Sequence, residues 1–264
     1  MRLVLLTWTI RPGNFTETDN SIDPKIRNNW YTAWILYYIT QSDFSHIVFC
    51  ENSNMTLSQL DILYDLADQY GKKIEYLTFQ WDFDAVQTYD YWYGEAEIID
   101  YAFENSAYIK NASSRYKITG RYVYPTINQT LKDLENTPHY FLNWLHHSGL
   151  LSVQTDFFKT NNKIYRKYIY KKSQSFYRSY IGSKKINLEQ LWYSLLRNMI
   201  YTRPQKRTRY IQYALIHRER VNFITYLRKK MWILEFWYIP RIVDMLFYSR
   251  SMVAQFIIKS QRWK

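Results

Sequence analysis

Cysteine is nearly absent from this sequence of 264 residues, since Cys50 is the only one. A single cysteine forms no internal disulfide, which excludes the small disulfide-stapled domains of secreted proteins. Glycine and proline are also scarce, at six residues each, and this excludes a linker-rich or low-complexity chain. Because the apolar run after Met1 has no small-residue cleavage site, we expect a cytosolic chain.

Two glycine-rich phosphate-binding motifs are missing as well. Neither Gly-x-Gly-x-x-Gly nor Gly-x-x-x-x-Gly-Lys-Ser/Thr occurs in the sequence. Their absence disfavours dinucleotide-dependent oxidoreductases and P-loop phosphotransferases. What the chain does have is apolar and aromatic content, with 47% hydrophobic residues and 27 tyrosines. A chain of this length and composition buries one substantial core.

Charge is distributed unevenly along the chain. Residues 1–158 carry a net charge of −8 and residues 159–264 a net charge of +20. A basic half rich in tryptophan and tyrosine indicates contact with an anionic surface, either membrane headgroups or nucleic acid. The alternative is a basic helical face that is simply solvated.

Short apolar and β-branched runs alternate with segments of helical periodicity. Strands are predicted at 3–9, 46–50, 74–79, 115–124 and 151–158. Helices are predicted at 26–40, at 56–70 before Gly71, from Gly94 onward, at 161–180 and after Asn187. This alternation predicts an α/β fold with one Rossmann-type, mostly parallel sheet and helices on both faces.

Polar residues follow several of these predicted strands. They are Arg11, Glu51 with Asn52, the loop 80–84, and Thr119 with Gly120 and Arg121. Ligands bind beyond the carboxyl ends of parallel strands, and this mixture of acids, amides and cations suits a nucleotide diphosphate. Lys117 and Arg121 share one face at strand spacing. Because unpaired buried charge is costly, we expect an anionic partner for them.

Four motifs, in this order, resemble one protein family. They are Leu-Leu-Thr-Trp-Thr-Ile-Arg-Pro at 5–12, Val-Phe-Cys-Glu-Asn-Ser at 48–53, Tyr-Gly-Glu-Ala-Glu-Ile-Ile-Asp-Tyr-Ala-Phe-Glu-Asn-Ser at 93–106, and Lys-Ile-Thr-Gly-Arg-Tyr at 117–122. The combination looks like bacterial glycosyltransferases of capsular-polysaccharide and lipopolysaccharide gene clusters. The resemblance implies a GT-A-like domain over residues 1–201 that uses a nucleotide-sugar donor.

The resemblance also implies the parts of a donor site. The residues expected to bind the donor are Arg11, Glu51, Asn52, Gly94, Glu95, Lys117, Thr119, Gly120 and Arg121. Many GT-A enzymes hold a divalent cation with Asp-x-Asp where this chain has Lys117 to Arg121. Protein cations neutralise a leaving diphosphate without a metal, so we expect metal-independent catalysis and no cofactor. A metal site at Asp82 and Asp84, or an acidic surface loop there, remains open.

An inverting transferase needs a carboxylate that takes the proton from the acceptor hydroxyl. Related folds place this acid in the downstream part of the chain. Glu189 is therefore the first candidate for the catalytic base, and Asp156 is the second. Asn187 is a plausible N-cap, which would place Glu189 in the first turn of a helix. The alternative for Glu189 is a first-turn acid that only complements the helix dipole.

The tail at 202–264 has 14 lysines and arginines against three acids. None of its uncharged runs approaches the roughly 18 apolar residues of a membrane-spanning helix. We expect an interfacial anchor on the inner face of the plasma membrane, beside a saccharide or lipid-linked acceptor. A helical hairpin packed on the sheet is the alternative.

A non-catalytic nucleic-acid-binding or anionic-surface-binding protein is a second functional class, although the nucleic-acid signatures are absent.

Overall fold

The computed structural model describes residues 1–11, 23–120, 122–124, 126–145, 151–179 and 186–196. Within these ranges, residues 1–144 and 152–196 belong to one compact unit. The boundary predicted at residue 202, the basic tail beyond it and Arg121 lie outside the described residues.

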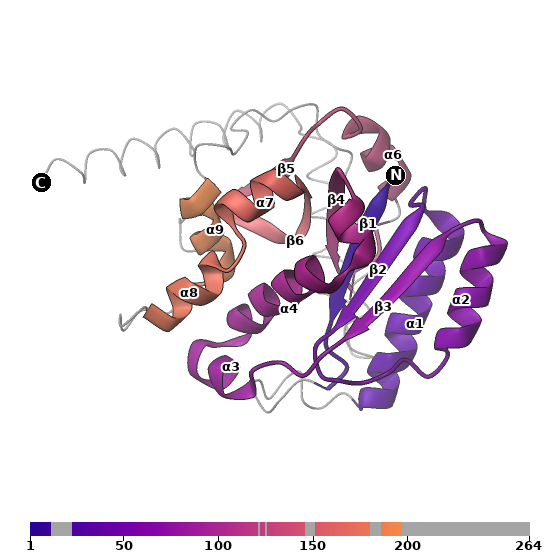
Figure 1. The fold of residues 1–264 in the computed structure, drawn as a ribbon, viewed down its shortest axis with the longest axis horizontal. Coiled ribbons are helices and arrows are strands. Elements are labelled where there is room, and N and C mark those ends of the chain that lie inside the picture. The colour runs from indigo at the N-terminus through magenta and orange to yellow at the C-terminus, as the bar shows by residue number, and fades with distance from the viewer. Residues whose placement is uncertain (12–22, 121, 125, 146–150, 180–185, 197–264) are drawn as a thin grey trace, which may run out of the picture. The chain divides into compact units, whose positions relative to one another are not determined.

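A six-stranded sheet in the order β3-β2-β1-β4-β6-β5 forms the centre of the unit (Figure 1). Its strands are β1 (Leu3–Trp8), β2 (His46–Glu51), β3 (Lys73–Thr78), β4 (Ser114–Thr119), β5 (Tyr140–Leu145) and β6 (Leu151–Asn161). Strand β1 pairs in parallel with β2 and with β4, and β2 pairs in parallel with β3. Strand β6 runs antiparallel to β4. The prediction of a mostly parallel α/β sheet is confirmed.

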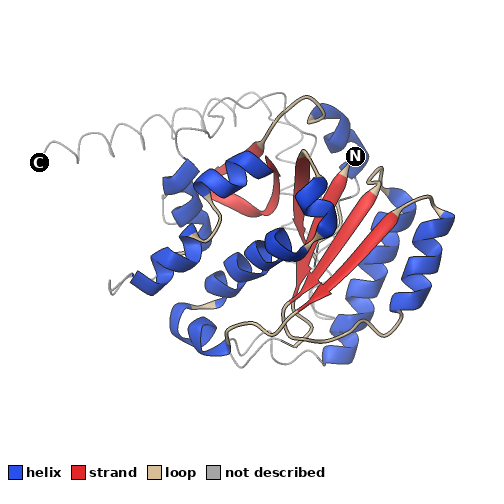
Figure 2. Ribbon diagram, viewed as in Figure 1, coloured by secondary structure: helices blue, strands red, loops and turns tan. Residues whose placement is uncertain are grey.

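Helices cover both faces of this sheet (Figure 2). They are α1 (Pro24–Gln41), α2 (Leu60–Gln69), α3 (Phe83–Tyr89), α4 (Tyr91–Asn105), α5 (Ala107–Asn111), α6 (Ile127–Asp133), α7 (Asn162–Tyr168), α8 (Lys172–Ser179) and α9 (Leu188–Leu196). Side chains that alternate along β1 enter two different cores. Leu3 and Leu5 pack in the cluster that includes α4, whereas Val4 and Leu6 pack in the cluster that includes α1 and α2.

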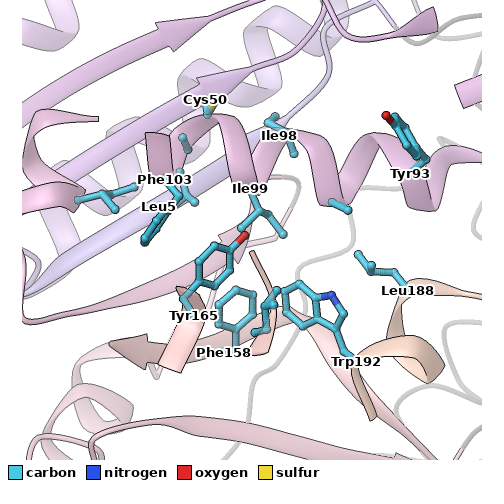
Figure 3. Close-up of a cluster of buried hydrophobic side chains, with 14 of the residues drawn as sticks. Leu5, Cys50, Tyr93, Ile98, Ile99, Phe103, Phe158, Tyr165, Leu188 and Trp192 are labelled. Carbon is cyan, nitrogen blue, oxygen red and sulfur yellow. The ribbon is translucent and has the colours of Figure 1, made fainter. Parts of the chain in front are cut away.

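The α4 side of the sheet holds the core that supports the candidate site. Figure 3 shows Ile99 of α4, Phe158 of β6, and Leu188 with Trp192 of α9 in one cluster. The Trp192 indole donates a hydrogen bond of 2.9 Å to the Ser173 hydroxyl of α8. These contacts hold α9 against α4 and β6, because a buried aromatic ring with a satisfied N–H fixes the packing of its helix.

Several predicted boundaries were wrong, and local backbone chemistry explains them. Helix α4 begins at Tyr91 and not at Gly94, because the Asp90 carboxylate accepts from the Tyr91 amide and caps the helix. The strand predicted over 115–124 ends at Thr119. The helix predicted over 161–180 is two helices, which separate where Lys171 adopts a φ of 56°. The short elements α3, α5, α6 and β5 were not predicted.

Candidate active site

The carboxyl ends of β1, β2 and β3 are joined by hydrogen bonds between the loops that follow them. The amide of Arg11 donates to the Ser53 hydroxyl at 3.0 Å. The Thr9 hydroxyl donates to the Asn52 side-chain oxygen at 2.6 Å, and the Trp81 amide donates to the Asn52 carbonyl at 2.9 Å. The structure therefore brings the predicted strand-end residues Arg11, Glu51 and Asn52 to one edge of the sheet.

Glu51 is fully buried at the centre of these loops. Its carboxylate accepts from the amides of Ile10, Ser53 and Met55 at 3.0, 2.9 and 2.9 Å. It also accepts from the Ser53 hydroxyl and, at 3.2 Å, from the Thr78 hydroxyl. These bonds occupy both carboxylate oxygens. Glu51 therefore joins the loops that follow β1 and β2 to the end of β3, a role that was not part of the sequence prediction.

Gly94 and Gly120 are both sites of close packing. A Cβ atom on Gly120 would come within 2.4 Å of the Trp8 ring and 2.9 Å of the Thr7 carbonyl, to which the Gly120 amide donates. A Cβ atom on Gly94 would come within 2.9 Å of the Trp81 ring. Only glycine, which has no Cβ atom, lets the backbone come this close to a neighbouring side chain or carbonyl. Both glycines therefore shape the loops at the carboxyl edge of the sheet.

Lys117 of β4 is completely buried, and its ammonium group has three hydrogen-bond partners. It donates to the Glu95 carboxylate of α4 at 2.8 Å and to the Thr119 hydroxyl at 2.8 Å. The third bond, of 2.6 Å, goes to the Thr155 carbonyl of β6. An ammonium group has three N–H bonds to donate, so all are used. The anionic partner expected for Lys117 is, in this structure, a carboxylate of the chain itself.

Glu189 lies in the first turn of α9, as predicted, and the Asn187 side chain caps that helix by accepting from the Gln190 amide at 2.7 Å. Burial raises the pKa of the Glu189 carboxyl to about 7. The charges of Glu95 and Asp156 raise this pKa further, and the charge of Lys117 opposes them. Like charges and burial disfavour the ionised carboxylate, whereas a nearby cation favours it. The two predicted catalytic acids therefore belong to one cluster.

Asp156 enters this cluster from β6. In the antiparallel pairing of β6 with β4, Phe157 lies opposite Ile118, so Asp156 comes next to Thr119 at the carboxyl end of β4. Thr155 supplies a carbonyl to Lys117 from the same place. We refer to Glu95, Lys117, Asp156 and Glu189 as the carboxylate cluster. Its members come from α4, β4, β6 and α9, four elements that are separated in the sequence.

Asp82 and Asp84 are placed differently from a paired metal motif. The Asp82 carboxylate accepts from the Ala85 amide at 3.0 Å as the cap of α3, and its other oxygen lies 3.4 Å from the Arg178 guanidinium. Both oxygens thus have partners, and Asp84 is exposed in the first turn of α3. Among the described residues no group of three potential metal-ligating side chains was found.

The sequence interpretation did not assign Thr155 or Tyr177 to the site. Thr155 contributes a main-chain carbonyl, which no side-chain pattern reveals. Burial raises the pKa of Tyr177, and the charge of Glu95 adds to the rise, so this tyrosine of α8 also lies near the cluster. One available signal was the buried lysine itself, because a buried charge needs hydrogen-bond acceptors, which can come from another element.

Comparisons with known proteins return weak similarities to solved structures only. No protein-family model matches the sequence, and no curated protein matches it. Glycosyltransferase GlyE from Streptococcus pneumoniae has a TM-score of 0.47 at 9% identity, covering 75% of this chain and 44% of GlyE. HddC from Yersinia pseudotuberculosis has a TM-score of 0.37 at 12% identity, covering 75% and 99% of the two chains. Mouse xyloside xylosyltransferase 1 has a TM-score of 0.38 at 8% identity, and the match covers 75% of this chain and 81% of the mouse protein. The chain thus spans less than half the length of GlyE.

Proposed function

We propose that this chain is a glycosyltransferase that moves a sugar from a nucleotide-diphosphate-sugar donor to a saccharide or lipid-linked acceptor in bacterial surface polysaccharide synthesis. The single observation that supports it most is the carboxylate cluster at the carboxyl edge of a parallel sheet. Glu189 is its titrating member, with a pKa of about 7. A general base works best when its pKa lies near the operating pH.

In the proposed reaction the acceptor hydroxyl gives its proton to Glu189. The acceptor oxygen forms a bond to the anomeric carbon of the donor sugar, and the bond from that carbon to the diphosphate breaks. The electron pair leaves on the phosphate oxygen, so the diphosphate departs as an anion. One base and one direct displacement invert the anomeric carbon. Asp156 remains the second candidate for the base.

Cations at the sheet edge offset the charge of the departing diphosphate in this proposal. Arg11 is exposed beyond β1, and its backbone is fixed through Ser53. Arg121, expected from the sequence to bind phosphate, lies outside the described residues. Arginine suits this role because its planar guanidinium binds phosphate oxygens in pairs. Lys117 contributes indirectly in this arrangement, since its three N–H bonds are directed to Glu95, Thr119 and Thr155.

The donor is identified by screening nucleotide sugars for thermal stabilisation of the protein and for release of nucleotide. A true donor at 100 times its Kd is expected to stabilise the fold by about 2.7 kcal/mol. Turnover with that donor is expected to persist in EDTA, because the proposed reaction needs no metal. Free nucleotide with the wrong base serves as the control. Loss of turnover in EDTA with recovery in manganese or magnesium would overturn metal independence, and no stabilisation by any donor would overturn the function.

An anionic membrane surface is the proposed partner on the acceptor side. Residues 162–179, which contain α7 and α8, include no acidic residue. Six cations of this segment are exposed: Lys163, Arg166, Lys167, Lys171, Lys172 and Arg178. Within the described part of the chain, no helix is long and apolar enough to span a bilayer. Contact with lipid at this basic face would bring the enzyme to a lipid-linked acceptor.

Replacing Lys163 and Lys167 together by glutamate is expected to weaken binding to anionic vesicles. Each basic residue near such a surface contributes about 1 kcal/mol, so the double variant should lose at least about tenfold in affinity at low salt. Flotation with phosphatidylglycerol-containing and neutral vesicles measures the effect. Lys25→Glu with Lys132→Glu is the matched control, because these exposed lysines lie on α1 and α6. Equal losses in both double variants would mean that only net charge matters.

A further inference from the structure

The ion pair between Lys117 and Glu95 points to a role for Glu95 other than binding the donor. Lys117 is fully buried and anchored by Thr119 and by the Thr155 carbonyl, so its ammonium position is fixed by β4 and β6. Its third N–H bond holds the Glu95 carboxylate at 2.8 Å. Turning the Glu95 carboxylate away would leave a buried cation without its carboxylate partner, which is costly.

Glu95 and Glu189 lie on helices that pack against each other. Helices α4 and α9 contact each other, and Leu188, which precedes Glu189, packs in the same core as Ala96, which follows Glu95. The contact between the two helices places Glu95 near Glu189, on whose pKa the charge of Glu95 acts. Among the described residues, the charges that act on Glu189 are those of Glu95 from α4, Asp156 from β6 and Lys117 from β4.

We propose that Glu95 is a positioning residue for the transfer reaction, whose clamped negative charge beside Glu189 sets the pH range in which Glu189 accepts the proton of the acceptor. This inference rests on the proposed function of Glu189 as the base. Lys117 is the clamp in this arrangement, since its N–H bond holds the Glu95 carboxylate in place. In this proposal Glu95 acts through Glu189 and not through contact with donor or acceptor.

Electrostatics gives the direction in which the Glu95 charge shifts the pKa of Glu189. A negative charge near a carboxyl disfavours its ionised form and raises its pKa, and this is the direction in which Glu95 acts on Glu189. Replacing Glu95 by glutamine removes that charge and leaves Lys117 uncompensated. Both changes favour ionised Glu189. The titration midpoint of Glu189 should therefore fall. The acid limb of the pH profile of kcat should move to lower pH with it.

The test is a carbon-13 titration of glutamate carboxyls in the full chain, with the Glu189 resonance assigned from Glu189→Gln. Wild-type Glu189 is expected to titrate near pH 7, and Glu95→Gln should lower that midpoint by about one unit. The matched control is Glu97→Gln on the same helix. Glu97 accepts from the Asp82 amide at 3.1 Å, and no effect of its charge on Glu189 is resolved. This control should leave the midpoint unchanged.

A second variant covers the case in which Glu95→Gln fails to fold. The double variant Lys117→Met with Glu95→Gln replaces the whole buried pair, a change that proteins often tolerate. Because Glu95 acts on Glu189 more strongly than Lys117 does, the midpoint should still fall, but by less. An unchanged midpoint in these variants overturns the role of Glu95. If the wild-type chain transfers no sugar, the proposed function fails, while the titration still decides whether Glu95 controls Glu189.

Discussion

Glu189→Gln is expected to lower kcat for sugar transfer by about 100- to 10,000-fold, the usual contribution of a general base. Glutamine keeps the shape of the side chain but cannot accept the proton of the acceptor hydroxyl. Folding should not suffer. Burial and two neighbouring acids make ionisation of this carboxyl unfavourable, and the substitution removes that cost at neutral and higher pH. Stabilisation by the donor should persist, because the donor does not require the base.

The measurement is single-turnover transfer across pH 5 to about 9 for wild type and variant. Wild-type kcat should rise with pH through the Glu189 pKa of about 7, since the base must be deprotonated. Asp156→Asn is the comparison variant. A large loss in Asp156→Asn with near-normal turnover in Glu189→Gln would transfer the role of base to Asp156.

Glu51→Ala is expected to destabilise the fold by about 4 kcal/mol or more. The substitution leaves the buried amides of Ile10 and Ser53, and the partly buried amide of Met55, without their acceptor. A buried donor without a partner costs about 1 to 3 kcal/mol, and removing one member of a buried charged network is strongly destabilising. Urea denaturation of the full chain, without donor, measures the loss.

Two outcomes distinguish the roles considered for Glu51. If Glu51 joins the two loops after β1 and β2 to the end of β3, Glu51→Ala lowers stability in the absence of any nucleotide. If Glu51 mainly binds the donor, stability is unchanged and only stabilisation by the nucleotide sugar is lost. Asp65→Ala is a suitable control, because Asp65 is an exposed acid of α2, and such substitutions usually change stability by less than about 0.5 kcal/mol.

Local patterns predicted the fold to a large extent. The run from Leu3 to Trp8 is apolar throughout, and all six residues are buried in β1. Helical spacing predicted α1 and α2, and Asn187 predicted the start of α9 and hence the place of Glu189. The shortest elements were missed, because the five residues of α5 are too few for helical periodicity to show. Asp90 was missed as the cap of α4, since its φ of 84° is unusual for a residue other than glycine.

The sequence by itself determined that a buried lysine would stand on β4, that polar residues would follow β1 and β2, and that Glu189 would open a helix. Only the tertiary structure decided that Glu95 meets Lys117 and that Asp156 and Glu189 join them. Local periodicity specifies which face of an element is buried, but not which other element covers it. That choice depends on the packing of α4, α9 and β6 in one core, and these elements are far apart along the chain. A buried lysine charge is costly without a partner, so Lys117 needed one. The packing of α4 in this core placed the Glu95 carboxylate beside it.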